Sequence, residues 1–276
     1  SLAILPLVAS ACWHPWTPYN NTTLFRLEAG SEAKNIKETN CRLWQELTSR
    51  DIPLGDIEYV VYKMPIAEYE SICATAIYTG NNAFMHWIKS NDREIVDFLL
   101  LAKRNEEIRC KYLSKWYYPT MKVGGPMSLE DVVEQSIAAK SERLRDRYLL
   151  QAVRALTTLG RYDECLALWD NEISLLPESN FFRRLCYQYI GGAYYHTGDV
   201  DKAMLLFASY GDTGSMHYIA DREDMVLTTM DIINYAYRSG STLLARYKGY
   251  IRDIIVDAET FPNVENVGDK PVISDD

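Results

Sequence analysis

The hydrophobic positions of this chain recur with the spacing of α-helices along most of its length. Between residues 33 and 49, the apolar side chains of Ile36, Leu43, Trp44 and Leu47 leave a polar face opposite them. Because such a stripe buries one side of a helix and exposes the other, this stretch predicts one amphipathic helix.

The pattern changes after this first helix. Residues 51–63 are ambiguous, because side chains such as Val60 and Val61 favour a strand whereas the neighbouring sequence is helical. From Pro65 the spacing predicts a helical pair over 66–78 and 83–89, split by a Gly-Asn-Asn turn.

A longer helix is predicted over 92–114, where Asn91 is a suitable N-terminal cap. The strongest interruption of the chain follows at 117–127, a stretch that is rich in Pro and Gly. Ser128 followed by Asp131 then has the arrangement of a capping box, which predicts that another helix starts there.

Residues 147–210 contain two helical hairpins whose small, aromatic and glycine positions recur in the same order. The first hairpin has Leu149, Leu156, Gly160, Tyr162, Cys165, Trp169 and Pro177, and the second has Ile190, Gly191, Tyr194, Gly198, Ala203 and Phe207. This spacing resembles the tetratricopeptide repeat, a helix-turn-helix unit of about 34 residues. The resemblance implies an all-α fold of antiparallel helical hairpins stacked as a right-handed solenoid.

The repeat frame is irregular at both ends. Its helix lengths require a break near Ser141, although residues 128–159 contain neither Gly nor Pro. A third unit is proposed around Ile232, Ala236 and Gly240, but Gly249 occupies the place of a large aromatic residue. The segment is therefore expected to be a helical hairpin that departs from the repeat signature.

In this repeat the first helix of each hairpin faces a concave groove, so the resemblance implies which residues face a ligand. The groove candidates are Arg147, Arg154, Gln188, Tyr195, His196, Asn234 and Tyr237, together with apolar Leu150 and Leu185. Arginines, amides and rings on neighbouring faces suit an extended peptide, a carboxylate or a sugar. The competing interpretation is that the arginines are solvated or paired with acids such as Asp146 and Glu164, and that His196 lies at a helix end where the helix dipole favours it.

Composition narrows the choice of partners. Of 276 residues, 38 are acidic and 29 are basic, which gives a net charge of −9, and no block of Lys and Arg is present. Nucleic acid is therefore not an expected partner. With 47% hydrophobic residues the chain can bury a sizeable core.

No feature of the sequence indicates a catalytic, metal or cofactor site. There is no Gly-rich phosphate loop, zinc signature or nucleophile elbow, and His217 is assigned to a loop. Besides Cys12, the five cysteines are widely spaced, so they form no recognisable disulfide framework, although one pair is not excluded. Cys165 stands where the repeat prefers Ala and is interpreted as a small buried residue.

The N-terminal segment resembles the end of a signal peptide. Residues 1–11 are mostly apolar or small, and Ala9, Ser10 and Ala11 precede Cys12. This arrangement resembles the lipobox of bacterial lipoproteins, in which the cysteine is acylated; the alternative is an ordinary cleaved signal peptide with an incidental cysteine. The apolar run is shorter than the roughly 20 residues needed for a transmembrane helix.

A Pro-rich and aromatic stretch follows Cys12, including Trp13 and Trp16, and a second aromatic cluster includes Trp116 and Tyr117. Together they resemble uncharacterised tetratricopeptide-like lipoproteins of Bacteroidota. The resemblance implies a non-enzymatic, membrane-tethered scaffold for a protein or peptide in the bacterial envelope, at the outer membrane and facing the periplasm. The alternative is a glycan-binding outer-membrane lipoprotein of nutrient uptake.

These expectations divide the chain into five parts. They are a signal-peptide remnant over 1–12 ending at the predicted lipidation residue Cys12, a tether over 13–30, a helical region over 31–120 interpreted as degenerate repeats, tetratricopeptide-like repeats over 128–260 and a polar tail over 261–276. The tail ends without a terminating element, and the expectation is a chain that is truncated at both ends.

Overall fold

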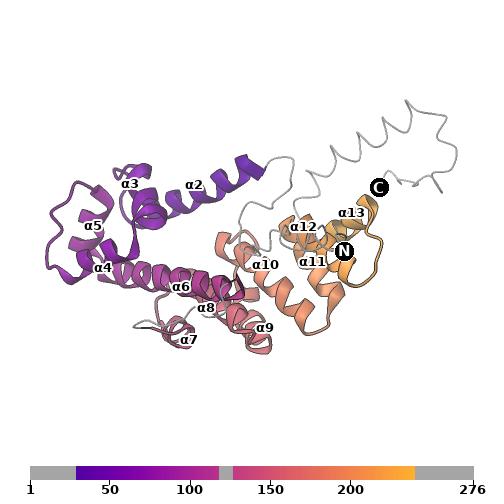
Figure 1. Ribbon diagram of the computed structural model, residues 1–276. Helices are drawn as coiled ribbons and strands as arrows, with labels where there is room; N and C mark the ends of the chain where they lie inside the picture. Colours follow the sequence, from indigo (N-terminus) through magenta and orange to yellow (C-terminus); the bar gives the residue numbers. More distant parts are fainter. Residues whose placement is uncertain (1–28, 118–126, 240–276) are drawn as a thin grey trace, which may run out of the picture.

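The computed structural model describes residues 29–117 and 127–239, and all regular structure within these ranges is helical (Figure 1). The first range contains α2 (Ala29–Leu47), α3 (Leu54–Glu58), the π-helix η1 (Tyr59–Lys63), α4 (Ile66–Ala74), α5 (Ala83–Asn91) and α6 (Arg93–Tyr117). The second contains α7 (Leu129–Ala138), α8 (Arg145–Leu159), α9 (Tyr162–Asn171), the short turn η2 (Ile173–Leu175), α10 (Phe181–His196), α11 (Val200–Tyr210), α12 (Thr213–Arg222) and α13 (Thr229–Arg238). The expected all-α class is therefore confirmed for the described part of the chain.

Helices α2 to α5, together with η1, pack around the N-terminal part of α6. Trp44 of α2 is buried there, with its ring centroid 5.7 Å from that of Phe98 and 6.3 Å from that of Phe84. Further along α6, Leu101 and Ile108 belong to a second core that is shared with α7 to α10. The long helix α6 therefore joins the two halves of the molecule through its buried side chains.

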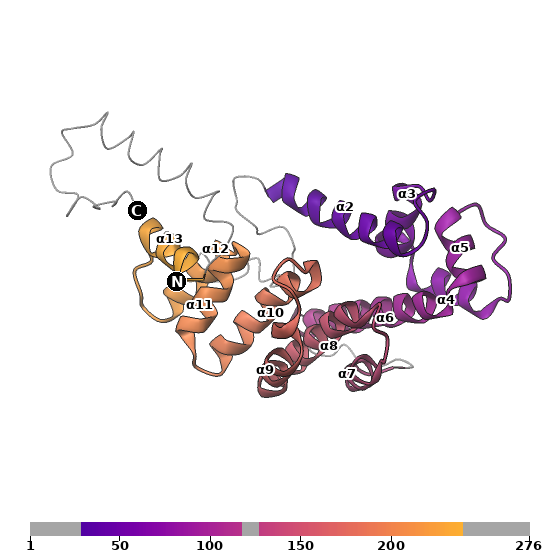
Figure 2. The same cartoon turned by 180° about the vertical axis from the view of Figure 1, so that it is seen from behind.

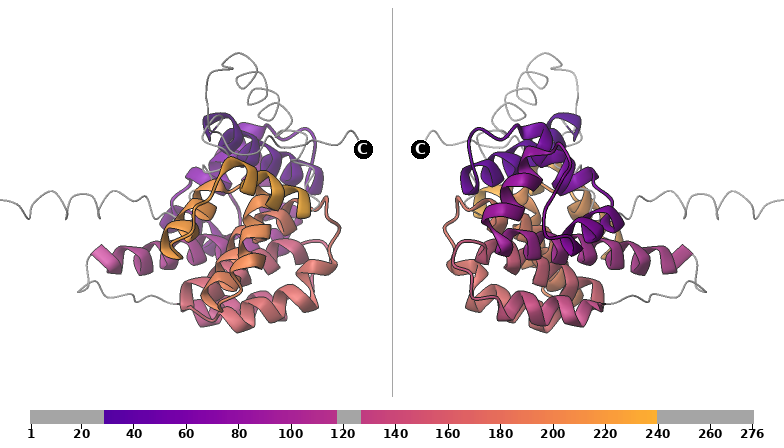
Figure 3. Two further views of the ribbon diagram at one scale, coloured as in Figure 1. Left: turned by 90° about the vertical axis from the view of Figure 1, so that its right-hand side faces the viewer. Right: turned by 90° about the vertical axis from the view of Figure 1, so that its left-hand side faces the viewer.

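The second half consists of helices that pack on their neighbours in the chain. α8 contacts α7, α9 and α10, and α10 contacts α9 and α11, so the longer helices α8 and α10 lie against each other. Figures 1 and 2 show α8 to α13 following one another towards one end of the molecule. Figure 3 shows α2 and α3 on the opposite side of the molecule from α7 to α9.

Two glycines have conformational reasons for their positions. Gly160 ends α8 with φ +71°, in the left-handed region, so the chain can turn directly into α9. Gly191 lies inside α10, where an added Cβ would be 3.0 Å from Cζ of Phe207 on α11. A larger residue would therefore push α11 away from α10.

Several local predictions for the second half are confirmed. The Ser128 Oγ accepts from the backbone N–H of Asp131 at 3.1 Å, while the Asp131 carboxylate accepts from the Ser128 N–H at 2.7 Å. The expected break near Ser141 is present, because α7 ends at Ala138 and α8 begins at Arg145. Cys165 is fully buried, as its place in the repeat predicts. All five described cysteines are free.

Other local predictions are wrong or are resolved by packing. Asp92, not Asn91, caps α6: its carboxylate accepts from the Ile95 N–H at 3.1 Å and also pairs with Arg143 at 2.6 Å, which Asn91 could not do with a neutral amide. The ambiguous 51–63 segment is helical from Leu54 to Lys63, and Ile57 is fully buried in the helical core.

Two further boundaries differ from the prediction. The helix expected over 66–78 ends at Ala74. His217 lies in α12 rather than in a loop, because Asp212 caps that helix by accepting from the Ser215 N–H at 3.0 Å. Of the third proposed repeat, α13 carries Ile232 and Ala236, whereas 240–249 lies outside the described residues.

Candidate functional site

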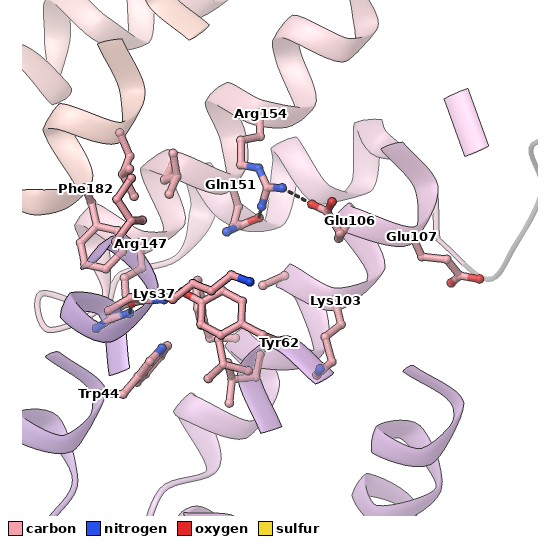
Figure 4. Close-up of a pocket in the computed structure, with 18 of the residues that line it drawn as sticks. Lys37, Trp44, Tyr62, Lys103, Glu106, Glu107, Arg147, Gln151, Arg154 and Phe182 are labelled. Carbon is pink, nitrogen blue, oxygen red and sulfur yellow. Dashed lines mark hydrogen bonds and ion pairs between the residues drawn. The ribbon is translucent and has the colours of Figure 1, made fainter. Parts of the chain in front are cut away.

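A cavity of about 580 Å³ lies between α2 and the helices α6, α8 and α10, with η1 and the start of α4 closing part of its wall. Figures 1 and 2 show α2 extended along the side of α6 and reaching towards α10. Figure 4 shows the lining side chains, which come from segments more than 100 residues apart in the sequence. The cavity therefore depends on the long-range packing of α2 against the rest of the molecule.

Arg147 of α8 is the most buried charged residue of this cavity, with 3% of its surface exposed. Its guanidinium carbon lies 3.7 Å from the ring centroid of Trp44 and 4.3 Å from that of Phe182. Its Nη1 donates to the amide oxygen of Asn40 at 2.9 Å. Both faces of the guanidinium are thus covered by rings from α2 and α10, as Figure 4 shows, while one edge is held by α2.

Burial affects the charge of this group. Removal from water lowers the pKa of Arg147 to about 9, against the opposing effects of Asp146 and Tyr62. The group still carries its charge at neutral pH. Among the described residues, no carboxylate forms an ion pair with Arg147, so a buried positive charge faces the cavity without a charged partner.

About two helical turns further along α8, Arg154 forms an ion pair with Glu106 of α6 (Figure 4). Arg109 approaches the same carboxylate, with 3.5 Å between its Nη1 and the Glu106 oxygen. Burial raises the pKa of Glu106, but the two arginines outweigh it and hold the pKa below its ordinary value. Gln151 completes this network, because its side-chain oxygen accepts from Arg154 at 3.3 Å and from Asn105 at 2.8 Å. Glu106, shared by two arginines, and the Gln151 amide hold this wall of the cavity together.

Two lysines line the same cavity without carboxylate partners among the described residues. Lys37 of α2 has its Nζ 5.7 Å from the ring centroid of Tyr62. The Tyr62 hydroxyl accepts from Asn40 at 2.6 Å, and burial raises its pKa to about 12, so the ring is neutral. Lys103 donates from its Nζ to the Met64 carbonyl at 2.9 Å, and burial lowers its pKa to about 8.

The seven groove residues predicted from the repeat frame do not all come together. Arg147 and Arg154 line the cavity, as do the apolar Leu150 and Leu185. Gln188 is buried elsewhere and donates to Asp212 at 3.1 Å, where it supports the cap of α12.

The remaining predicted groove residues lie near the C-terminal end of the described chain. The Tyr195 hydroxyl donates to Glu223 at 3.3 Å, and the His196 ring stacks on Tyr162 at 4.4 Å with an interplanar angle of 9°. Burial lowers the pKa of His196. Asn234 and Tyr237 are exposed on α13, outside the residues that line the cavity.

The alternative interpretation, in which the predicted groove arginines are solvated or paired with acids, holds for Arg154 but not for Arg147. Arg154 is paired with an acid, but the acid is Glu106 of α6, since Glu164 pairs with Arg161 at the start of α9. Arg147 is neither solvated nor paired with a carboxylate of the described chain. The distinction could not be made from the sequence, because it depends on which helix covers α8.

The N-terminal residues of the cavity, Lys37, Asn40, Trp44 and Tyr62, are functional candidates that the sequence reasoning missed. The repeat frame assigns groove positions only to hairpins that follow its signature, and these residues lie before the first such hairpin. The amphipathic pattern of 33–49 gave one usable signal, since it predicted that Trp44 packs against another element.

Other predicted features cannot be placed. Cys12, Trp13 and Trp16 lie outside the described residues, and so do the side chains of Trp116 and Tyr117 at the end of α6. Within 29–117 and 127–239, no group of three His, Cys, Asp or Glu residues is arranged to hold a metal ion. In the same ranges, none of the helices combines the length and apolar character needed to cross a membrane.

Comparison with family models, curated proteins and solved structures finds no match to this chain. The tetratricopeptide and Bacteroidota lipoprotein resemblances therefore remain predictions. The function has to be argued from the cavity itself.

Proposed function

We propose that this protein is a non-enzymatic helical-repeat scaffold that binds a segment of a protein or peptide partner in the cavity between α2, α6, α8 and α10. The observation that carries the proposal is the clamped guanidinium of Arg147, which faces this cavity between Trp44 and Phe182. A rigidly held charged donor beside apolar walls fixes the orientation of a ligand while the walls contribute binding area.

The size of the cavity supports a short segment as the occupant. About 580 Å³ falls within the range of roughly 300–1,000 Å³ typical of ligand sites. This space accommodates a few side chains of an extended chain but not a folded domain. The apolar lining includes Leu150 and Leu185, so the segment is expected to contribute apolar as well as polar groups.

The packing order supports a repeat scaffold. In a tandem array of hairpins, the first helices of successive pairs lie side by side and share one concave face. The contact of α8 with α10, each of which also contacts the helix that follows it, agrees with that arrangement. The tetratricopeptide-like right-handed solenoid is part of the proposal on this basis.

Photo-crosslinking tests where the partner binds. A photoreactive amino acid is placed at Leu185, which lines the cavity, and in a matched protein at Leu175, which is 76% exposed on η2 outside it. We expect a polypeptide adduct from the position 185 protein in its native cells and none, or much less, from the position 175 protein. Equal adducts at both positions, or none at either, would contradict peptide binding in this cavity.

The same proteins address the glycan alternative. The full-length protein is passed over an immobilised polysaccharide, with and without a substitution in the cavity. If the wild-type protein is retained and the cavity variant is not, glycan binding replaces the peptide proposal. Retention that is independent of the cavity would leave the peptide proposal as it stands.

The tether and location are also proposed rather than observed. We propose that Cys12 is acylated and anchors the protein in the bacterial envelope, at the outer membrane and facing the periplasm. This part of the proposal rests on the small residues before Cys12 and is independent of the cavity.

A further inference from the structure

Arg147 is an unusual residue for a structural role, because a buried charge is stabilising only when it is well paired. Removing a guanidinium from water is unfavourable, and a carboxylate partner is the usual compensation. Here the compensation consists of two aromatic rings and the amide oxygen of Asn40. A charged acceptor is missing from the edge of the guanidinium that faces the cavity.

The other charges of the cavity show the same imbalance. Its two acidic residues, Glu106 and Glu107, are already paired, the first with Arg154 and the second with Lys111 at 2.8 Å. Lys37 and Lys103 are not paired with any carboxylate of the described residues. The cavity is therefore positively charged, in a chain whose net charge is −9.

This local excess of positive charge is a property of the assembled site. The lysines and Arg147 come from α2, α6 and α8, and the distance along the chain from Asn40 to Arg147 is 107 residues. Positive potential inside a cavity with apolar walls attracts anions more strongly than the same charges would on an open surface, because the walls exclude solvent.

We propose that the cavity binds a carboxylate of its ligand, and that Arg147 is the residue that holds it, with Lys37 adding electrostatic attraction once the ligand has entered the cavity. This proposal rests on the proposed function, so the carboxylate is that of an acidic side chain or of a free C-terminus in the bound segment. The ligand completes the ion pair that the folded protein leaves open.

The geometry around Arg147 favours a carboxylate over a bulkier anion. Trp44 and Phe182 cover the two faces of the guanidinium, so a ligand can approach only along the plane of the group. A planar group with two oxygens can accept two parallel N–H bonds along such an edge. A phosphate would need several donors converging on its tetrahedral oxygens, and the neighbouring Asn40 already gives one of its two amide N–H groups to Tyr62.

A peptide selection tests the proposal. Two synthetic pools of random hexapeptides, one with free C-terminal carboxylates and one amidated, are passed over the immobilised full-length protein, and the bound peptides are sequenced. We expect enrichment of Asp and Glu in both pools if a side chain supplies the carboxylate. If the C-terminus supplies it, we expect retention of the free-acid pool only.

Variants then locate the carboxylate. Arg147→Met should weaken binding of the selected peptides by at least about tenfold, which corresponds to about 1.4 kcal/mol. Arg161→Met removes one arginine charge outside the cavity, where Arg161 pairs with Glu164, and should leave binding unchanged. Lys37→Met changes only an exposed side chain, so it tests the electrostatic contribution even if Arg147→Met fails to fold, and it should weaken binding several-fold at low salt.

The outcomes separate the two proposals. Peptides that are selected without any preference for carboxylates, or that bind Arg147→Met and Lys37→Met as tightly as wild type, would overturn the carboxylate inference while leaving peptide binding in place. A selection that retains no peptide from either pool would overturn the peptide-binding function, and the carboxylate inference with it.

Discussion

Replacing Arg147 with Met tests whether Arg147 binds the ligand or stabilises the folded protein. The substitution removes two cation–π contacts, worth about 1 kcal/mol each, and one charge-assisted hydrogen bond to Asn40, worth about 1.5–3 kcal/mol. It also removes the desolvation cost of the buried guanidinium, which is several kcal/mol. Met keeps contact with the rings of Trp44 and Phe182, because its thioether packs well on aromatic side chains. We therefore expect the free energy of unfolding to change by no more than about 1 kcal/mol in either direction.

Urea unfolding of the ligand-free protein, followed by circular dichroism, measures this change. The matched control is Arg109→Met, which removes an arginine that is equally buried at 2% exposure. That arginine donates to the Thr158 hydroxyl at 2.9 Å and lies 3.5 Å from the Glu106 carboxylate, so its loss removes a buried hydrogen bond and one of the two arginines that Glu106 contacts. We expect Arg109→Met to cost about 2 kcal/mol or more.

The stability lost in Arg147→Met, compared with that lost in Arg109→Met, shows which role Arg147 has. If Arg147→Met destabilises the free protein as much as Arg109→Met does, Arg147 is a structural contact between α2, α8 and α10. The proposal that Arg147 binds a ligand carboxylate would then be refuted. A stable Arg147→Met protein that no longer binds selected peptides is the outcome that the carboxylate proposal requires.

Three further predictions concern other parts of the chain. Phe207→Ala should lower the free energy of unfolding by about 3–5 kcal/mol, because Phe207 is 5% exposed and packs against Gly191. Tyr194→Ala should lower it less, because Tyr194 is only partly buried. Equal thermal unfolding of the two variants would contradict this packing. Burial lowers the pKa of Lys103 from 10.5 to about 8, so between these pH values the unfolded chain binds more protons than the folded protein, and the contribution of Lys103 to stability rises with pH. In parallel urea titrations, Lys103→Met should therefore gain less stability than wild type from pH 8 to 10. Identical pH profiles of the two proteins would show that the Lys103 amine is fully solvated. Cys12→Ala should move the full-length protein from the membrane to the soluble fraction after cell fractionation, and persistent membrane association would remove the lipid-anchor proposal.

The parts of the fold that could be predicted are those determined by neighbouring residues. The capping box of Ser128 and Asp131 and the buried Cys165 each follow from interactions within one or two helices. The wrong cap at Asn91 shows the limit of this reasoning. Two suitable capping residues were adjacent, and the choice of Asp92 depends on Arg143, 51 positions later in the chain.

The candidate site was only half predictable for the same reason. The repeat frame identified Arg147 and Arg154 on one face of α8, because that face is defined by local periodicity. It gave no information on the partner of either arginine. Arg154 is neutralised by Glu106 of α6, whereas Arg147 meets the amide and the indole of α2.

The charge of the cavity differs from the overall charge of the chain. A net charge of −9 suggests a protein that repels anions, yet the acids of the cavity are paired while Lys37, Lys103 and Arg147 have no carboxylate partner among the described residues. Electrostatic attraction inside a cavity depends on the charges that line it, since those on the outer surface are screened within about 10 Å at ordinary ionic strength. The acidic surface would then slow the approach of an acidic segment without weakening the ion pair that forms inside. Raising the salt concentration should accordingly increase the association rate while also increasing the dissociation rate, a combination that a uniformly basic or uniformly acidic site would not produce.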